Sequence, residues 1–78
     1  MIGKPKYSIG DIVKFKLDNK IETGVVAIVD DYGTFFDSSD VSYDILNRDE
    51  SVFYKHISEK YIVDKIGEMK EDLIWVGM

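Results

Sequence analysis

The sequence predicts one small domain built mostly of β-strands, a compact barrel of five to six short strands with one short helical turn. Apolar and polar side chains alternate along residues 12–18, which is the period of a strand with one buried face. Turn-forming residues recur roughly every ten residues, as is typical of short antiparallel strands. The 78 residues suffice for one hydrophobic core. We therefore expect a single domain, for which one barrel is the most economical fold.

The first two expected strands carry the clearest signals. Along residues 12–18, apolar side chains fall on one face and lysines on the other. Asp18-Asn19-Lys20 predicts the following turn, because asparagine tolerates left-handed backbone angles. A second, longer strand is expected over residues 21–29. Gly24 interrupts it, and an isolated glycine in a strand usually marks a bulge or a bend of the kind that closes a small barrel.

The rest of the chain predicts shorter elements. In order, these are a turn over 30–33, a strand over 34–36, a polar loop over 37–40, a strand over 42–46, a turn over 47–50, a strand over 52–56, one helical turn over 57–60, an extended segment over 61–66, and a tail with one helical turn before an extended run over 73–76. In the strand over 52–56, Val52, Tyr54 and His56 should share one face. The aromatic residues expected to fill the barrel are Phe15, Phe35, Tyr43 and Phe53.

Four segments of this pattern resemble the small SH3-like and KOW-like barrels. They read YSIGDIVKF (7–15), TGVVAIV (23–29), SYDIL (42–46) and YKHISEKYI (54–62). In those barrels a Gly-Asp pair precedes the first strand, a Gly-Val bend lies in the second, and a one-turn helix leads into the last. The resemblance implies one SH3-like domain over 1–78, with a leader over 1–9 and a tail over 67–78. It also implies a phage or prophage protein, since short proteins of this kind are common there.

The charge of the chain is unevenly distributed. Net charge is −5, and residues 21–50 carry eight acidic side chains against one arginine. Binding to nucleic acid is not expected of such a chain, because neutralising phosphates requires an excess of lysine and arginine. The first twenty residues are the exception, with five lysines against two aspartates. These lysines, which leave weak nucleic-acid binding as an open alternative, are Lys4, Lys6, Lys14, Lys16 and Lys20.

Composition also bears on compartment and on structural metals. The chain has no cysteine, which fits a reducing cytoplasm, and a single histidine cannot complete a zinc site. The longest apolar run, residues 25–29, is far shorter than the roughly 20 residues that a membrane helix needs. We therefore expect a cytoplasmic protein without a membrane span, located in the host cytoplasm if a phage encodes it.

No enzyme active site is predicted. Histidine is the residue type whose unperturbed pKa is near neutrality, and His56 is the only one in the chain. Asp44 or Glu59 could pair with it, but the spacing does not indicate such a pair. We expect His56 to be half-buried at a strand end, with one backbone hydrogen bond. The loop over 37–42 lacks the glycine and the glutamate of a calcium site, and no phosphate-binding glycine loop occurs. The sequence therefore predicts no metal and no cofactor.

The aromatic side chains and the acidic loops are the best functional lead. The aromatic residues are too numerous for one small core to hide, and rings with a polar tip are favoured in interfaces. The leading hypothesis is a non-catalytic interaction module that presents acidic loops, including Asp49 and Glu50, and exposed rings to the basic surface of a host protein. A sharper version is a mimic of nucleic-acid charge. The candidate binding residues are Asp30, Asp31, Tyr32, Phe36, Asp37, Asp40, Tyr54, His56 and Trp75.

A second hypothesis is an oligomeric protein that binds a small, nucleotide-like molecule. In that case tyrosines would stack on a ring, and Lys14, Lys16 and Lys55 would meet phosphates. The apolar run over 73–76 bears on oligomerisation, because an exposed strand of this kind tends to pair with other chains. Either the tail folds back on the barrel or it pairs with a second copy.

Overall fold

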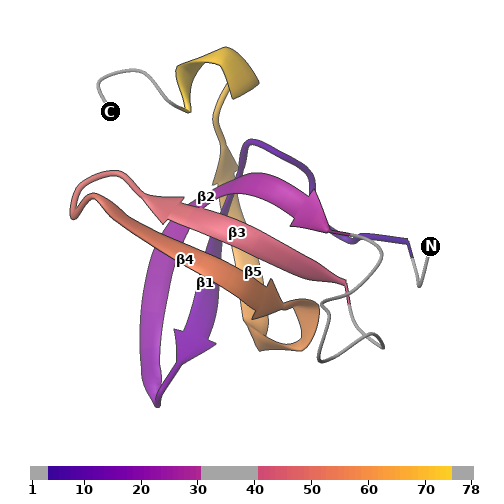
Figure 1. The fold of residues 1–78 in the computed structure, drawn as a ribbon, viewed down its shortest axis with the longest axis vertical. Helices are drawn as coiled ribbons and strands as arrows, with labels where there is room; N and C mark the ends of the chain where they lie inside the picture. Colours follow the sequence, from indigo (N-terminus) through magenta and orange to yellow (C-terminus); the bar gives the residue numbers. More distant parts are fainter. Residues whose placement is uncertain (1–3, 31–40, 75–78) are drawn as a thin grey trace.

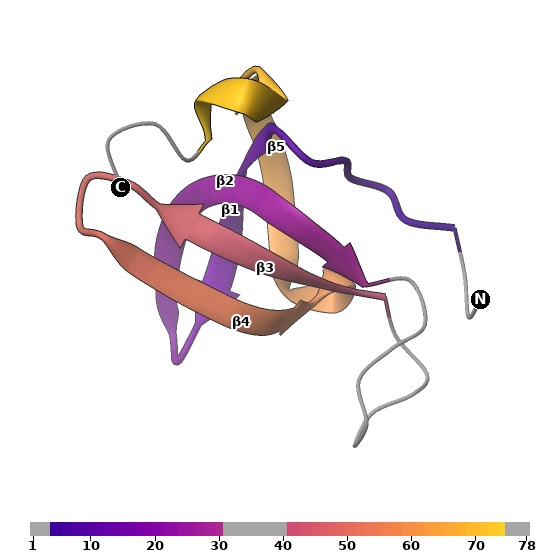
Figure 2. The same cartoon turned by 45° about the horizontal axis from the view of Figure 1, so that its top comes forward.

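The computed structural model describes residues 4–30 and 41–74, which form one five-stranded antiparallel sheet (Figures 1 and 2). The elements are β1 (Asp11–Leu17), β2 (Lys20–Asp30), β3 (Ser42–Asn47), β4 (Val52–Ser58), the 3-10 turn η1 (Glu59–Tyr61), β5 (Ile62–Glu68) and the 3-10 turn η2 (Glu71–Leu73). Their order across the sheet is β4-β3-β2-β1-β5. The prediction of a small, mostly β domain with five to six short strands and one helical turn is confirmed.

The local features behind the resemblance to SH3-like barrels occupy their expected places. Gly10 directly precedes β1, Gly24 lies within β2, and η1 leads into β5. The helical turn begins two residues later than predicted, at Glu59, and η2 agrees with the helical turn expected in the tail. The strand expected over 34–36 lies outside the described residues. Membership of the SH3-like family stays a prediction.

A two-residue turn fixes the register of β1 against β2. Leu17 pairs with Lys20, so only Asp18 and Asn19 connect the strands. Their φ angles are 49° and 69°, as in a type I′ turn, whose twist matches that of antiparallel strands. Asparagine and aspartate are the residues besides glycine that most readily adopt such angles. The predicted turn therefore forms, and it holds the alternating residues of β1 on their two faces.

The sheet curls so that β3 and β4 cross over β1 and β5 in both views (Figures 1 and 2). Bulges accompany the curl, because an extra residue bends and twists its strand. In β2, Ala27 is an extra residue between Val26 and Ile28, which both pair with β3. The ladder between β1 and β5 contains two register shifts. Gly24 has a different role from the expected bulge. A Cβ there would lie 2.6 Å from Ile45 Cγ2 and 2.8 Å from the Leu46 carbonyl oxygen, so glycine allows β3 to approach closely.

The main hydrophobic core lies inside the curl. Its buried residues are Val13, Phe15, Val26, Val41, Tyr43, Ile45, Ile57 and Ile62. Phe15 and Tyr43 are fully buried, as predicted. Phe53 is only half-buried and packs against a second cluster, so its predicted place in the barrel interior is wrong. Phe35 lies outside the described residues.

The second cluster covers part of the opposite face of the sheet. It consists of the buried residues Val25, Ala27, Leu46 and Ile74, with Ile12, Phe53 and Met69 packed against it. Ile74 is fully buried although it follows η2. Of the two arrangements expected for the tail, folding back onto the sheet is therefore the one adopted at Ile74.

A bulge in β4 overturns the face predicted for His56. Tyr43 pairs with Ile57 and Ile45 pairs with Tyr54, so two residues of β4 lie opposite Asp44 alone. His56 takes a φ angle of 59° and is exposed. The extra residue shifts the alternation by one, which turns Ile57 into the core and His56 away from it. The expected half-burial of His56 is therefore wrong. The backbone N–H of His56 donates to Asp44 Oδ1 at 2.9 Å.

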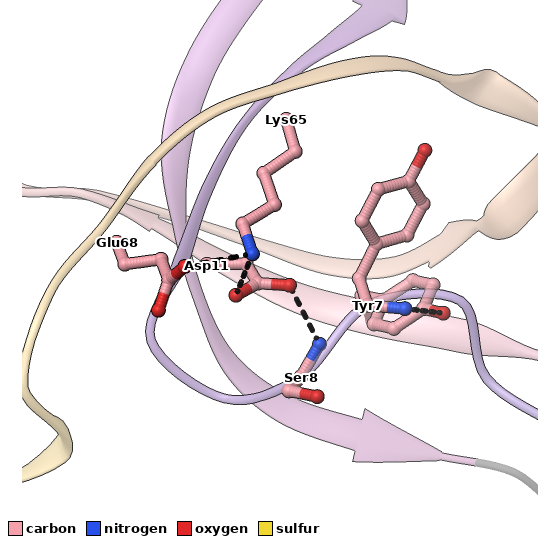
Figure 3. A network of polar contacts seen from close by, with 6 residues as sticks. Tyr7, Ser8, Asp11, Lys65 and Glu68 are labelled. Carbon is pink, nitrogen blue, oxygen red and sulfur yellow. Dashed lines mark hydrogen bonds and ion pairs between the residues drawn. The ribbon is translucent and has the colours of Figure 1, made fainter.

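Polar contacts attach the N-terminal segment to the sheet around Asp11 (Figure 3). The Asp11 carboxylate accepts the Ser8 N–H at 2.9 Å and lies 3.3 Å from Lys65 Nζ. Lys65 also contacts Glu68 Oε2 at 3.1 Å. These two carboxylates, Glu68 first, raise the pKa of Lys65. Asp11 is buried, and its charge is compensated by β5 and by its own turn.

Gly10 connects three parts of the chain through its backbone. Its N–H donates to the Val26 carbonyl at 2.9 Å, and its carbonyl accepts the Met69 N–H at 2.6 Å. Its φ angle is 99°, in the region that favours glycine. A Cβ at this position would collide with the carbonyl oxygen of Met69. Backbone conformation and space therefore both require glycine here.

We predict that Gly10→Ala lowers the free energy of unfolding by at least about 2 kcal/mol, because it combines a strained φ angle with a backbone clash. Gly67→Ala is the matched control on β5, since its Cβ would make only ordinary contact with Ile12 Cδ1 at 3.5 Å. The control should change stability by less than about 1 kcal/mol. Urea unfolding followed by circular dichroism measures the stability of both variants. Equal effects of the two substitutions would contradict the requirement for glycine at position 10.

Candidate functional site

Only three of the nine candidate binding residues lie within the described residues, and the structure does not bring them together. The other six are Asp31, Tyr32, Phe36, Asp37, Asp40 and Trp75. Asp30 is half-buried at the end of β2, where it pairs with Ser42. Tyr54 is half-buried and turned toward the core, whereas His56 is exposed at the bulge. The bulge in β4 thus directs the Tyr54 side chain toward the core and the His56 side chain away from it.

Tyr54 forms the centre of a surface that sequence analysis identified only in part. Its ring packs edge-on against buried Phe15, with centroids 5.1 Å apart and planes at 71°. Its hydroxyl donates to Glu22 Oε2 at 3.4 Å. The register places Glu22 beside this ring, because Phe15 and Glu22 are direct partners in the β1–β2 ladder. The ring is therefore held by packing on one side and by a carboxylate at its tip.

The β3–β4 turn adds negative charge to this surface. Asp49 and Glu50 are exposed in the turn, and the Asn47 side chain accepts the Glu50 N–H at 3.1 Å. Partial burial is the largest cause that raises the pKa of Tyr54, followed by the charges of Glu22 and then Glu50. The phenol therefore stays neutral at physiological pH and faces two carboxylates. We call Tyr54, Glu22 and Glu50 the acidic aromatic surface.

A second polar network lies at the other end of β3, and no local pattern in the sequence indicates it. The Tyr43 hydroxyl donates to Glu59 Oε2 at 2.5 Å and accepts the Tyr7 N–H at 3.3 Å. The same carboxylate oxygen accepts the Lys6 N–H at 3.1 Å. The rings of Tyr7 and Tyr43 meet edge-on at 5.8 Å. Glu59, considered as a partner of His56, instead holds the N-terminal segment on the core.

A groove lies on the opposite face of the sheet. It has a volume of about 460 Å³, within the range of small binding pockets. Its floor is apolar and comes from Ile12, Val25, Leu46 and Met69. Its rim is polar and comes from Thr23 and from residues 47–49 and 51 of the β3–β4 turn. The groove therefore offers an apolar pocket with hydrogen-bonding groups at its edge.

Among residues 4–30 and 41–74, no cluster of three histidine or acidic side chains is arranged to hold a metal ion. Within the same ranges, no helix has the length and apolar character needed to cross a membrane. Comparison of the chain with protein-family models, with curated proteins and with solved structures found no match. We therefore infer function from the geometry of the chain itself.

Burial, and then the hydrogen bond to Glu59, raise the pKa of Tyr43 well above its usual value of about 10. A tyrosine whose pKa is raised by folding stabilises the fold fully below its unfolded pKa, and this contribution is lost as pH rises toward the folded pKa. We predict that Tyr43→Phe costs about 1 kcal/mol at neutral pH, because hydrogen bonds are lost. The difference between the variant and the original chain should shrink above about pH 10.

Urea unfolding at neutral and alkaline pH measures this difference. Tyr61→Phe is the matched control, because the Tyr61 ring is exposed and lies under the ammonium group of Lys60. That control should leave stability unchanged at both pH values. A gap between Tyr43→Phe and the original chain that stays constant with pH would contradict the role assigned to the Tyr43 hydroxyl.

Proposed function

We propose that this chain is a non-catalytic interaction module that binds the basic surface of a partner protein through its acidic aromatic surface. The observation that carries the proposal is the Tyr54 ring, packed on Phe15 and bordered by the carboxylates of Glu22 and Glu50. A rigid ring with a polar tip loses little conformational entropy on binding, which is why tyrosine is common at the energetic centres of interfaces.

The electrostatics of this surface favour a cationic partner. A lysine or arginine of the partner would lie over the Tyr54 ring and pair with Glu22 or Glu50, combining a cation–π contact with a charge-assisted hydrogen bond. The net charge of −5 adds a long-range attraction that speeds encounter with a basic surface. Glu50 of the β3–β4 turn is exposed and extends the same potential beyond the ring.

The proposed partner is a host protein, and this part of the proposal comes from the resemblance to small phage barrels. A host protein that binds nucleic acid is the sharper version, because its phosphate-binding surface is basic and accepts carboxylates in place of phosphates. Asp30 belongs to the same net-negative part of the chain, residues 21–50. Binding would take place in the host cytoplasm.

We predict that the immobilised chain captures basic proteins from a bacterial lysate and that Glu22→Gln/Glu50→Gln reduces this capture at least about tenfold, since two charge pairs are lost. Glutamine retains the shape of glutamate and can still accept the Tyr54 hydroxyl. Mass spectrometry of the eluted proteins, at low and at high salt, provides the measurement.

The matched control is Asp64→Asn/Glu71→Gln, which removes the same charge from exposed side chains on β5 and η2. Capture by this control should equal that of the original chain. The proposal fails if both double variants lose capture equally, if the captured proteins are acidic, or if high salt leaves capture unchanged.

A further inference from the structure

The groove and two lysines lie on the same face of the β1–β2 hairpin. Side chains alternate along a strand, so Ile12, Lys14 and Lys16 share the face of β1 that points away from the main core. Directly opposite residues of an antiparallel pair share a face as well. The partners on β2 are Val25 for Ile12, Thr23 for Lys14 and Ile21 for Lys16. Figure 1 shows this hairpin extending beyond the rest of the sheet.

This face changes character along its length. At one end, Ile12 and Val25 contribute to the apolar floor of the groove. Thr23 then forms the edge of the groove, directly opposite Lys14. Beyond it, Lys16 lies opposite Ile21, whose side chain is 56% exposed. The face therefore begins with an apolar pocket at Ile12 and continues with two positive charges, at Lys14 and Lys16, each two residues further along β1.

Both lysines are exposed, and neither makes a hydrogen bond or an ion pair with another described residue. The charged groups that face them from neighbouring elements are few. Asp64 of β5 lies opposite Lys14, and the rim of the groove carries Arg48 and Asp49. The Lys14 and Lys16 end of the face is thus positive, within a chain whose net charge is −5.

We propose that this face binds an extended acidic peptide of a partner protein, with one apolar side chain in the groove and acidic side chains on Lys14 and Lys16. Extended chains advance about 3.3 Å per residue, so a peptide aligned with the hairpin has the same spacing between its residues as β1. The acidic side chains then lie two and four residues from the apolar one. The proposal concerns the face opposite Glu22 and is independent of the function proposed above.

The length of the face distinguishes this ligand from other anions. From Val25 to Ile21 the strand advances four residues, or about 13 Å, so a compact molecule in the groove does not reach Lys16. A nucleic acid would span the distance, yet two lysines neutralise too few phosphates for measurable binding at physiological salt. An extended peptide satisfies both the apolar pocket and the spacing of the charges.

The probe is a fluorescein-labelled ten-residue peptide with leucine at one position, glutamate two and four positions later, and serine elsewhere. Fluorescence anisotropy should show saturable binding that disappears when lysines replace the glutamates. Lys14→Glu/Lys16→Glu should weaken binding at least about tenfold, since each exposed pair is lost and replaced by repulsion. Lys4→Glu/Lys60→Glu changes net charge equally at exposed positions outside the groove and should retain binding within about twofold.

A second variant tests the groove itself. Thr23→Trp places a large ring at the groove edge, at an exposed strand position where tryptophan is well tolerated. It should weaken binding at least about tenfold while the circular dichroism spectrum stays unchanged. Nuclear magnetic resonance of the original chain is a further readout, in which the peptide should shift the backbone amides of Thr23, Val25 and Met69.

Several results would overturn the proposal. Absence of saturable binding would do so, as would equal weakening by Lys14→Glu/Lys16→Glu and by the matched control. Amide shifts confined to residues away from the groove would place the peptide elsewhere. Tighter binding of a single-stranded oligonucleotide, or of a fatty acid without peptide bonds, would assign the face to a different ligand.

Discussion

The register of β1 between its two neighbours is the constraint on which both faces of this molecule depend. Phe15 is buried opposite Glu22 on β2 and Ile62 on β5, whereas Lys14 and Lys16 point to the other side. A slip of one residue would exchange these sets and bury the lysines. The two-residue turn after β1 prevents that slip, because it admits only one register for the hairpin.

Bulges in three of the five strands accompany the curl of the sheet. Extra residues in β2, β4 and β5 let outer strands bend around Phe15 and Tyr43 while the ladders continue. The two edge strands, β4 and β5, both contain irregular pairs, which makes them poor templates for another strand. The same bulges expose residues such as Val63, which is 60% accessible, without creating a flat apolar edge.

Sequence reasoning succeeded where a pattern is local and failed where contacts are distant. The alternation in β1 and the turn at Asp18 and Asn19 depend on neighbouring residues, and both form as predicted. The face on which His56 lies depends on a bulge that the alternation of apolar and polar residues does not reveal. The alternation therefore predicted the wrong face for His56. The contact between Tyr43 and Glu59 joins residues 16 positions apart through the fold. Most of the predicted binding residues lie in 31–40, outside the described residues.

The β1–β2 hairpin therefore separates two surfaces of opposite charge by the thickness of one sheet. Glu22 and the Tyr54 ring lie on the inner side, and Lys14 and Lys16 on the outer side. Both sides share the backbone hydrogen bonds of the hairpin. Coulomb interaction between charged ligands on the two sides is screened by ions in solution over about 8 Å at physiological salt. The two proposed partners, one basic and one acidic, would thus lie on opposite sides of one hairpin.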